Sequence, residues 1–246
     1  MQVKLKEIRA VVFDLDGTLI DTLPDLTTAV NATLTALGAR NLPQARVKEL
    51  IGDGADKLVA RAVAEATTGE PELSDADEQA RAMQLFLRYY EEHLYVQSRV
   101  YPDAARVLRI LREKGLRVGC VTNKSSRFAI PVLERAGLSG FLELTLCADR
   151  NEDRKPSPAL LLETCRRLQL APSEMLYVGD AHTDVIAARA AGCGAVAVTF
   201  GYHKEGALER AKPDATVASL MGIVTDVLHL APDAAGPAAR MQEVPT

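Results

Sequence analysis

The chain has 246 residues, of which 48% are hydrophobic and 25% charged, and it carries a formal net charge of −4. This length suits one large domain or one domain with a smaller insert, and the composition is that of an ordinary globular protein. A slightly negative chain has no bulk attraction to nucleic acid or to an anionic membrane, and no apolar run approaches the roughly 20 residues that span a bilayer.

The N-terminal stretch Met1 to Arg9 is mixed polar and runs directly into an apolar segment. It lacks the charged, apolar and small-residue regions of a signal peptide. We therefore expect a cytoplasmic protein that binds neither nucleic acid nor membrane. The sequence gives no indication of the oligomeric state.

Short apolar runs alternate with amphipathic stretches along most of the chain. Strands are expected at Ala10–Phe13, Val118–Val121, Leu142–Leu146 (the weakest), Met175–Val178 and Ala195–Val198. Helices are expected from Asp103, as N-cap, to Gly115, and over Ser125–Ala136, Pro158–Leu168 and Thr183–Ala191. The alternation predicts an α/β fold, a doubly wound parallel sheet.

The segment from about Asp21 to Ser98 interrupts this alternation, because it contains no strong strand pattern. It is expected to form helices over Leu23–Leu37, Gln44–Ala66 and Asp75–Leu94. We predict a core of residues 1–20 and 99–230, a helical cap of residues 21–98 over the carboxyl ends of the strands, and a disordered tail of residues 231–246.

Two acidic pairs follow predicted strands. Asp14 and Asp16 come directly after the first strand and point the same way along an extended segment, with Gly17 allowing a sharp turn. Asp180 and Asp184 follow a later strand, although Asp184 alone also suits a helix start. A calcium loop, the alternative for the first pair, requires a preceding helix and a later Glu, and neither is present. Clustered oxygen ligands with few carboxylates favour Mg²⁺.

Donor and cationic groups follow two other strands. Thr122 and Asn123 precede a helix and could hold a phosphate oxygen through hydroxyl and backbone N–H groups, or simply cap that helix. Lys155 lies beside Pro156, in a backbone that two prolines restrict. It is either a phosphate-binding charge or a solvated surface lysine. The four segments together predict an acidic metal site next to an anion site.

The segments Asp14–Thr18, Val121–Asn123, Lys155–Pro156 and Gly179–Asp180 with Asp184 resemble the four motifs of the haloacid dehalogenase superfamily of phosphatases. The resemblance runs from about Ile8 to Leu230 and includes the helical insert, which resembles that superfamily's cap on a Rossmann-like core. Within the superfamily the chain is most similar to bacterial phosphoglycolate phosphatases, on segments such as Ile51–Ala55 and Thr199–Tyr202.

The resemblance implies a role for each matched residue. Asp14 would be the nucleophile and a Mg²⁺ ligand, and Asp16 the general acid and base, with its backbone carbonyl on the metal. Asp180 would be the third protein ligand, and Asp184 would support the metal directly or through water. Thr122, Asn123 and Lys155 would bind the phosphoryl group.

Several functions remain open at this stage. The leading one is a Mg²⁺-dependent phosphatase of a small phosphate ester, 2-phosphoglycolate first, through an aspartyl-phosphate intermediate. The alternatives are a sugar-phosphate or amino-sugar-phosphate phosphatase, a phosphomutase of the same fold, and a non-catalytic binding protein. His182 and Lys57 are further candidates for substrate contact, against packing and surface roles.

Overall fold

The computed structural model describes residues 7–67, 75–204 and 206–232. Apart from its first two residues, the predicted tail 231–246 lies outside the described residues. In the described ranges, no helix is both long enough and apolar enough to cross a bilayer.

A six-stranded parallel sheet forms the centre of the molecule. Its strand order is β5-β4-β1-β6-β7-β8. The strands are β1 (Ala10–Phe13), β4 (Arg117–Thr122), β5 (Leu144–Cys147), β6 (Met175–Gly179), β7 (Gly194–Val198) and β8 (Ala215–Val217). The α/β class and the doubly wound parallel sheet are thus confirmed, with β8 as an edge strand that the sequence analysis did not predict.

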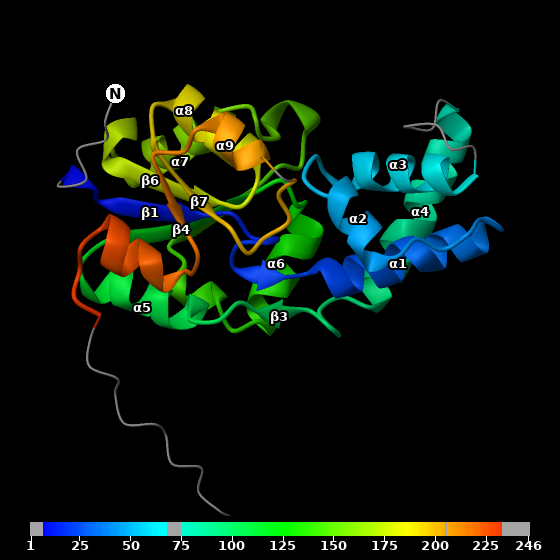
Figure 1. Ribbon diagram of the computed structural model, residues 1–246, viewed down its shortest axis with the longest axis horizontal. Coiled ribbons are helices and arrows are strands. Elements are labelled where there is room, and N and C mark those ends of the chain that lie inside the picture. Colours follow the sequence, from blue (N-terminus) through cyan, green and yellow to red (C-terminus); the bar gives the residue numbers. More distant parts are fainter. Residues whose placement is uncertain (1–6, 68–74, 205, 233–246) are drawn as a thin grey trace, which may run out of the picture.

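Helices cover both faces of the sheet because its central strands are apolar on both sides. Val11 and Phe13 of β1 face one cluster of buried residues, and Ala10 and Val12 face another. The first cluster contains α5 (Ala104–Glu113) and α6 (Ser126–Arg135). The second contains α7 (Ala159–Leu168), α8 (His182–Ala191) and α9 (Ala207–Ala211), on the opposite side of the sheet in Figure 1.

Four helices lie together to one side of the sheet, at the right of Figure 1. They are α1 (Leu23–Ala36), α2 (Gln44–Leu50), α3 (Ala55–Thr67) and α4 (Ala76–Glu92). The chain enters and leaves this group through two short antiparallel strands, β2 (Ile20–Asp21) and β3 (Arg99–Val100). We refer to α1–α4 and their connections as the helical insert.

Two expectations about helices were wrong. The single helix predicted over Gln44–Ala66 is two helices, because the connection between them carries Gly52 and Gly54 at φ +131° and +97°. These values lie outside the helical range and favour glycine. Asp103 does not cap α5 with its side chain; it has a left-handed backbone, at φ 63°.

Short helical turns complete the described structure. They are η2 (Ser139–Phe141), η3 (Asn151–Asp153), η4 (Pro172–Glu174) and the π-helical η5 (Ile223–Val227). The buried side chain of Asp25 ties the start of α1 to the segment that precedes β3. Its carboxylate accepts hydrogen bonds from the backbone N–H groups of Val96, Gln97 and Ser98, at 3.0, 2.7 and 3.0 Å.

Candidate active site

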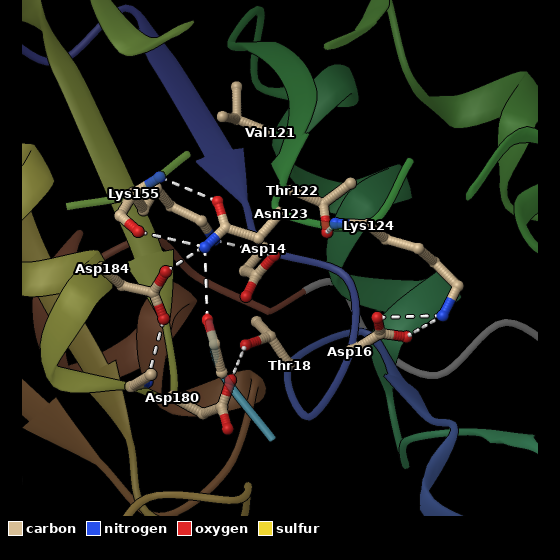
Figure 2. Close-up of polar contacts among 12 residues, drawn as sticks. Asp14, Asp16, Thr18, Val121, Thr122, Asn123, Lys124, Lys155, Asp180 and Asp184 are labelled. Atoms are coloured by element: carbon tan, nitrogen blue, oxygen red, sulfur yellow. Dashed lines mark hydrogen bonds and ion pairs between the residues drawn. The ribbon is translucent and has the colours of Figure 1, made fainter. Parts of the chain in front are cut away.

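Three carboxylates converge at the carboxyl ends of β1 and β6. Oxygens of Asp14, Asp180 and Asp184 all lie within 4.8 Å of one another, and all three residues are buried. Asp14 follows β1, Asp180 follows β6, and Asp184 lies in the first turn of α8. Neighbouring parallel strands therefore bring Asp14, from the first predicted acidic pair, next to both members of the second pair (Figure 2).

Hydrogen bonds fix two of these carboxylates. Asp180 accepts from the Thr18 hydroxyl at 3.0 Å and from the backbone N–H of Tyr202 at 2.6 Å. Asp184 accepts from the backbone N–H of Ala181 at 2.9 Å. Because most of these donors are backbone or buried groups, the carboxylates are held before any ligand arrives.

Two of these carboxylates occupy space that is free only because three neighbouring residues are glycines and have no Cβ atom. A Cβ atom at Gly201 would lie 2.3 Å from the Cβ of Asp180, and one at Gly179 would lie 2.3 Å from the carboxylate of Asp184. Gly17, at φ +82°, faces Asp180 in the same way, at 2.5 Å. A larger side chain at any of the three would push a carboxylate out of the cluster.

Lys155 supplies the positive charge of the cluster. Its buried ammonium lies 2.9 Å from Oδ1 of Asp14, 2.6 Å from Oδ1 of Asp184 and 2.9 Å from the hydroxyl of Tyr177. Burial alone would lower the pKa of Lys155, but the two carboxylates outweigh it and hold this pKa above its usual range. Lys155 is therefore a fixed cation and not a solvated surface lysine.

The three carboxylates carry more negative charge than the one nearby ammonium can balance. Burial raises the pKa of Asp14 to about 6 although Lys155 opposes the change, and burial together with Asp184 and Asp14 raises the pKa of Asp180 to about 8. Oδ1 of Asp14 is buried and, despite the nearby ammonium, has no partner in hydrogen-bonding geometry among the described residues. Three carboxylates, one ammonium and an orphaned oxygen fit a hard divalent cation such as Mg²⁺.

Asp16 lies apart from this cluster. Its carboxylate faces the ammonium of Lys124, at 3.1 and 3.0 Å, and accepts a hydrogen bond from the Thr22 hydroxyl at 2.6 Å. In Figure 2 it points away from Asp180 and Asp184. The carboxylate of Asp16 is therefore not placed as a metal ligand, which leaves only its backbone carbonyl for that role.

The two residues after β4 differ in what their side chains do. Thr122 is buried, and its hydroxyl accepts a hydrogen bond from the backbone N–H of Lys124 at 3.1 Å. The amide of Asn123 is already engaged: it donates to the carbonyls of Lys155 and Gly52, at 3.1 and 3.2 Å, and accepts from the N–H of Lys155 at 2.8 Å. Asn123 therefore positions Lys155 and joins the core to the helical insert.

One cavity covers these residues, and core and insert both line it. Its core side includes Asp14, Asp16, Thr122, Lys155 and Asp180, and its insert side includes Gly52, Gly54 and Tyr90. Asp184 is not in the lining and acts behind Lys155.

The two further candidates differ in position. His182 lines the cavity, whereas Lys57 is exposed on α3 and is absent from the lining. Lys57 lies about 100° around the helix from Leu58, which faces inward. The expectation that Lys57 reaches the substrate is not supported by this placement.

Several residues that line this site were not predicted as site residues from the sequence, among them Tyr90, Lys124, Arg154 and Tyr202. The backbone N–H of Tyr202 donates a hydrogen bond to Asp180. Its hydroxyl donates to the carboxylate of Asp21 and accepts from the backbone N–H of Thr22, where the chain enters the insert. No local pattern marks these residues, since each acquires its partner only through the fold.

Comparison with known proteins agrees with this geometry. A family model described as haloacid dehalogenase-like hydrolase matches residues 8–192. The phosphoglycolate phosphatase of Nitrosospira multiformis is 43% identical over 213 residues, which cover 87% of this chain and 92% of that protein. The phosphoglycolate phosphatase of Escherichia coli K12 is 39% identical over 230 residues, covering 88% and 91%.

A solved structure supports the same relationship. A protein of Haemophilus somnus, described as a predicted phosphoglycolate phosphatase, superimposes with a TM-score of 0.84 at 32% identity, covering 89% of this chain and 98% of that one. The family match includes the segments that carry all three clustered carboxylates and Lys155. The chain therefore belongs to the haloacid dehalogenase-like hydrolases.

Proposed function

We propose that the protein is a phosphatase that uses Asp14 as its nucleophile and 2-phosphoglycolate as its substrate. The observation that carries the proposal is the position of Asp14, which lines the cavity and contacts both the buried ammonium of Lys155 and the carboxylate cluster. The substrate is supported by relatives named phosphoglycolate phosphatase at 43% and 39% identity over most of both chains.

The first half of the reaction transfers the phosphoryl group to the enzyme. The carboxylate of Asp14 attacks phosphorus, the bond from phosphorus to the ester oxygen breaks, and an aspartyl phosphate forms. Asp16 gives its proton to the departing oxygen, which leaves as glycolate. Lys155 offsets the charge that would otherwise repel the ester from Asp14.

The second half returns the enzyme to its starting state. Asp16, now deprotonated, takes a proton from a water molecule that attacks the phosphorus of the aspartyl phosphate. The acyl phosphate bond breaks, inorganic phosphate leaves, and Asp14 is again a carboxylate. Asp16 suits both steps because its carboxylate lies outside the Asp14–Asp180–Asp184 cluster but lines the same cavity.

The proposal includes Mg²⁺ as the cation that the site binds. Asp14 and Asp180 would hold it, with the backbone carbonyl of Asp16 and support from Asp184. When bound, it supplies positive charge against the phosphate oxygens during transfer. Thr122 would donate its hydroxyl to the transferring phosphoryl group, and Asn123 would act by positioning Lys155. The cytoplasmic location stays part of the same proposal.

The test is kcat/KM across a panel of phosphate esters with Mg²⁺ present, containing 2-phosphoglycolate, hexose phosphates, an amino-sugar phosphate and pyrophosphate. We expect 2-phosphoglycolate to be preferred and free phosphate to be released in equal amount to glycolate. A tenfold preference for an amino-sugar phosphate, about 1.4 kcal/mol in transition-state binding, would reject the substrate and keep the mechanism. Isomerised sugar phosphate without free phosphate would indicate a mutase instead.

A further inference from the structure

A second cationic position lies in the same cavity, away from the carboxylate cluster. Lys124 follows β4, and its side chain is only 6% exposed. Its ammonium contacts both oxygens of Asp16 and lies 4.8 Å from the centre of the Tyr90 ring. A lysine at this depth is unusual unless it pairs with an anion, and Asp16 offers a single carboxylate that Thr22 already shares.

Tyr90 brings a donor from the helical insert to the same place. Tyr90 in α4 is 2% exposed and lines the cavity, and its buried hydroxyl has no hydrogen-bond partner within the part of the chain that the structure describes. Its ring stacks with Phe86 and meets Phe128 edge-on, at 5.5 and 5.0 Å between ring centres. These neighbours hold the ring beside Lys124, so the hydroxyl is a fixed group whose proton has no acceptor among the described residues.

The other cations of the cavity are less suited to a small substrate's second anion. The ammonium of Lys155 forms ion pairs with Asp14 and Asp184. Arg61 pairs with Asp53 at 2.6 Å, and Arg154 pairs with Asp56 at 2.5 Å, both within or against the helical insert. Lys204 lines the cavity but is exposed to solvent, where a charge contributes less to binding.

The chemistry of the ester sets where its carboxylate must lie. The departing oxygen has to reach Asp16, which gives it a proton. In 2-phosphoglycolate the carboxylate is separated from that oxygen by one methylene group, so it must lie beside Asp16. Two groups contact Asp16 there, the hydroxyl of Thr22 at 2.6 Å and the ammonium of Lys124 at 3.0 and 3.1 Å, and of these the ammonium carries the charge that a carboxylate requires.

We infer that Lys124 and Tyr90 form the subsite for the carboxylate of the substrate, an assignment that rests on the proposed function. The ammonium forms an ion pair with the carboxylate, and the Tyr90 hydroxyl donates a hydrogen bond to it. Tyr90 comes from α4, whereas Lys124 comes from the core. The subsite is therefore complete only when the insert lies against the core, which couples recognition of a short carboxylate to closure of the site.

The test compares 2-phosphoglycolate with ethyl phosphate, which has a methyl group in place of the carboxylate. Lys124→Met keeps the length of the side chain and removes its charge. Because a charged hydrogen bond is lost, we expect kcat/KM for 2-phosphoglycolate to fall by about 10- to 100-fold more than for ethyl phosphate. Tyr90→Phe keeps the ring, so its selective loss should be smaller, about three- to tenfold.

Two matched variants complete the design. Lys57→Met removes an exposed cation outside the cavity and should leave both rates unchanged. Lys204→Met removes the rival cation of the cavity and should change the ratio of the two substrates less than Lys124→Met does.

The possible results distinguish a failure of the proposed subsite from a failure of the proposed function. If the wild type prefers 2-phosphoglycolate but Lys124→Met loses both activities equally, or if Lys204→Met shows the selective loss, the subsite is wrong and the proposed function stands. If the wild type does not hydrolyse 2-phosphoglycolate, both are wrong. Should Lys124→Met fail to fold, Tyr90→Phe decides the assignment, because an unchanged substrate ratio in that variant would overturn it.

Discussion

At the scale of single residues, the site is defined by charge that is only partly balanced. The ammonium of Lys155 faces Asp14 and Asp184, while Asp180 relies on the Thr18 hydroxyl and a backbone N–H. Such a cluster is costly to bury unless a further cation joins it. The same imbalance that makes the site suitable for a metal should make its metal-free form less stable.

Asp14→Asn tests this balance and the nucleophile together. Asparagine is nearly the same shape but cannot attack phosphorus, so activity should fall below about 1% of wild type. Because burial raises the pKa of Asp14 to about 6, the ionised carboxylate opposes folding above that pH. Removing the charge should therefore keep or raise the melting temperature in chelator at pH 7.5. Substantial turnover by this variant would reject Asp14 as the nucleophile.

The glycines around the carboxylates give a second prediction at this scale. Gly201→Ala places a methyl group 2.3 Å from the Cβ of Asp180, so that side chain must move. We expect the Mg²⁺ concentration for half-maximal activity to rise by about tenfold or more. Gly140→Ala is the matched control, because a Cβ there meets nothing within 4 Å and its φ is not positive. Equal effects of the two changes would refute the argument.

At the scale of elements, the connection between α2 and α3 joins the insert to the core residues around Lys155. Gly52 accepts a hydrogen bond from Asn123, and the guanidinium of Arg154 lies against Gly54 and pairs with Asp56. Arg154 directly precedes Lys155. The insert is thus linked to the residue that precedes Lys155 and to Asn123, which hydrogen-bonds to the backbone of Lys155.

Gly54→Ala should weaken this link. A Cβ at Gly54 would lie 2.9 Å from the guanidinium carbon of Arg154, in addition to the strain of a positive φ. Gly38→Ala carries a similar backbone strain, at φ +72°, but its Cβ meets nothing within 4 Å. We expect similar losses of melting temperature from both changes and a several-fold fall of kcat/KM only in Gly54→Ala. A matching fall in Gly38→Ala would show that strain alone is responsible.

The strands and helices also show which parts of the fold can be predicted from sequence patterns. The central strands β1, β4, β6 and β7 were predictable because apolar runs that are buried on both faces stand out from their surroundings. The strands β2, β3 and β8 were missed, since two or three residues carry no period and pair only with distant segments. The split of the predicted helix over Gln44–Ala66 was signalled by its glycines.

The residues predicted at the site divide in the same way. Asp14 and Asp180 come directly after β1 and β6, Asp16 lies two residues beyond Asp14, and Lys155 lies in the loop after β5. The carboxyl ends of these parallel strands all lie on one side of the sheet. Lys124 also follows a strand, β4, but its partners reach it only in the folded protein, where Tyr90 of α4 and the carboxylate of Asp16 bury it. Sequence patterns therefore located the residues proposed to act on phosphate, whereas the proposed carboxylate subsite depends on tertiary contacts.

At the scale of the whole molecule, the site is formed by the carboxyl ends of the strands on one side and by the helical insert on the other. The core holds the carboxylates and Lys155, and the insert contributes Tyr90 and the glycine-rich connection. The side chain of Asp25 ties α1 to the segment before β3, and Tyr202 joins Asp21, at the entry to the insert, to Asp180. Metal binding at Asp180 should therefore stabilise the entry to the insert as well as the site itself.

Magnesium removal tests this arrangement on the entire chain. In chelator, the raised pKa of Asp180, about 8, means that the folded protein holds a proton that the unfolded chain releases near pH 4. This contribution to stability is present at low pH and is lost as the pH rises through about 8. Magnesium binds the deprotonated cluster, so it should restore stability most where protons compete least.

We therefore expect added Mg²⁺ to raise the melting temperature more at pH 8 than at pH 6, measured by differential scanning calorimetry. Asp180→Asn removes a ligand and the titrating carboxylate together, so its Mg²⁺-dependent shift should be small at both pH values. Glu163→Gln is the matched control, because it removes a partly exposed carboxylate of α7 that pairs only with Arg166 and Arg167 in the described chain. An equal Mg²⁺ shift in wild type and Asp180→Asn would place the cation elsewhere.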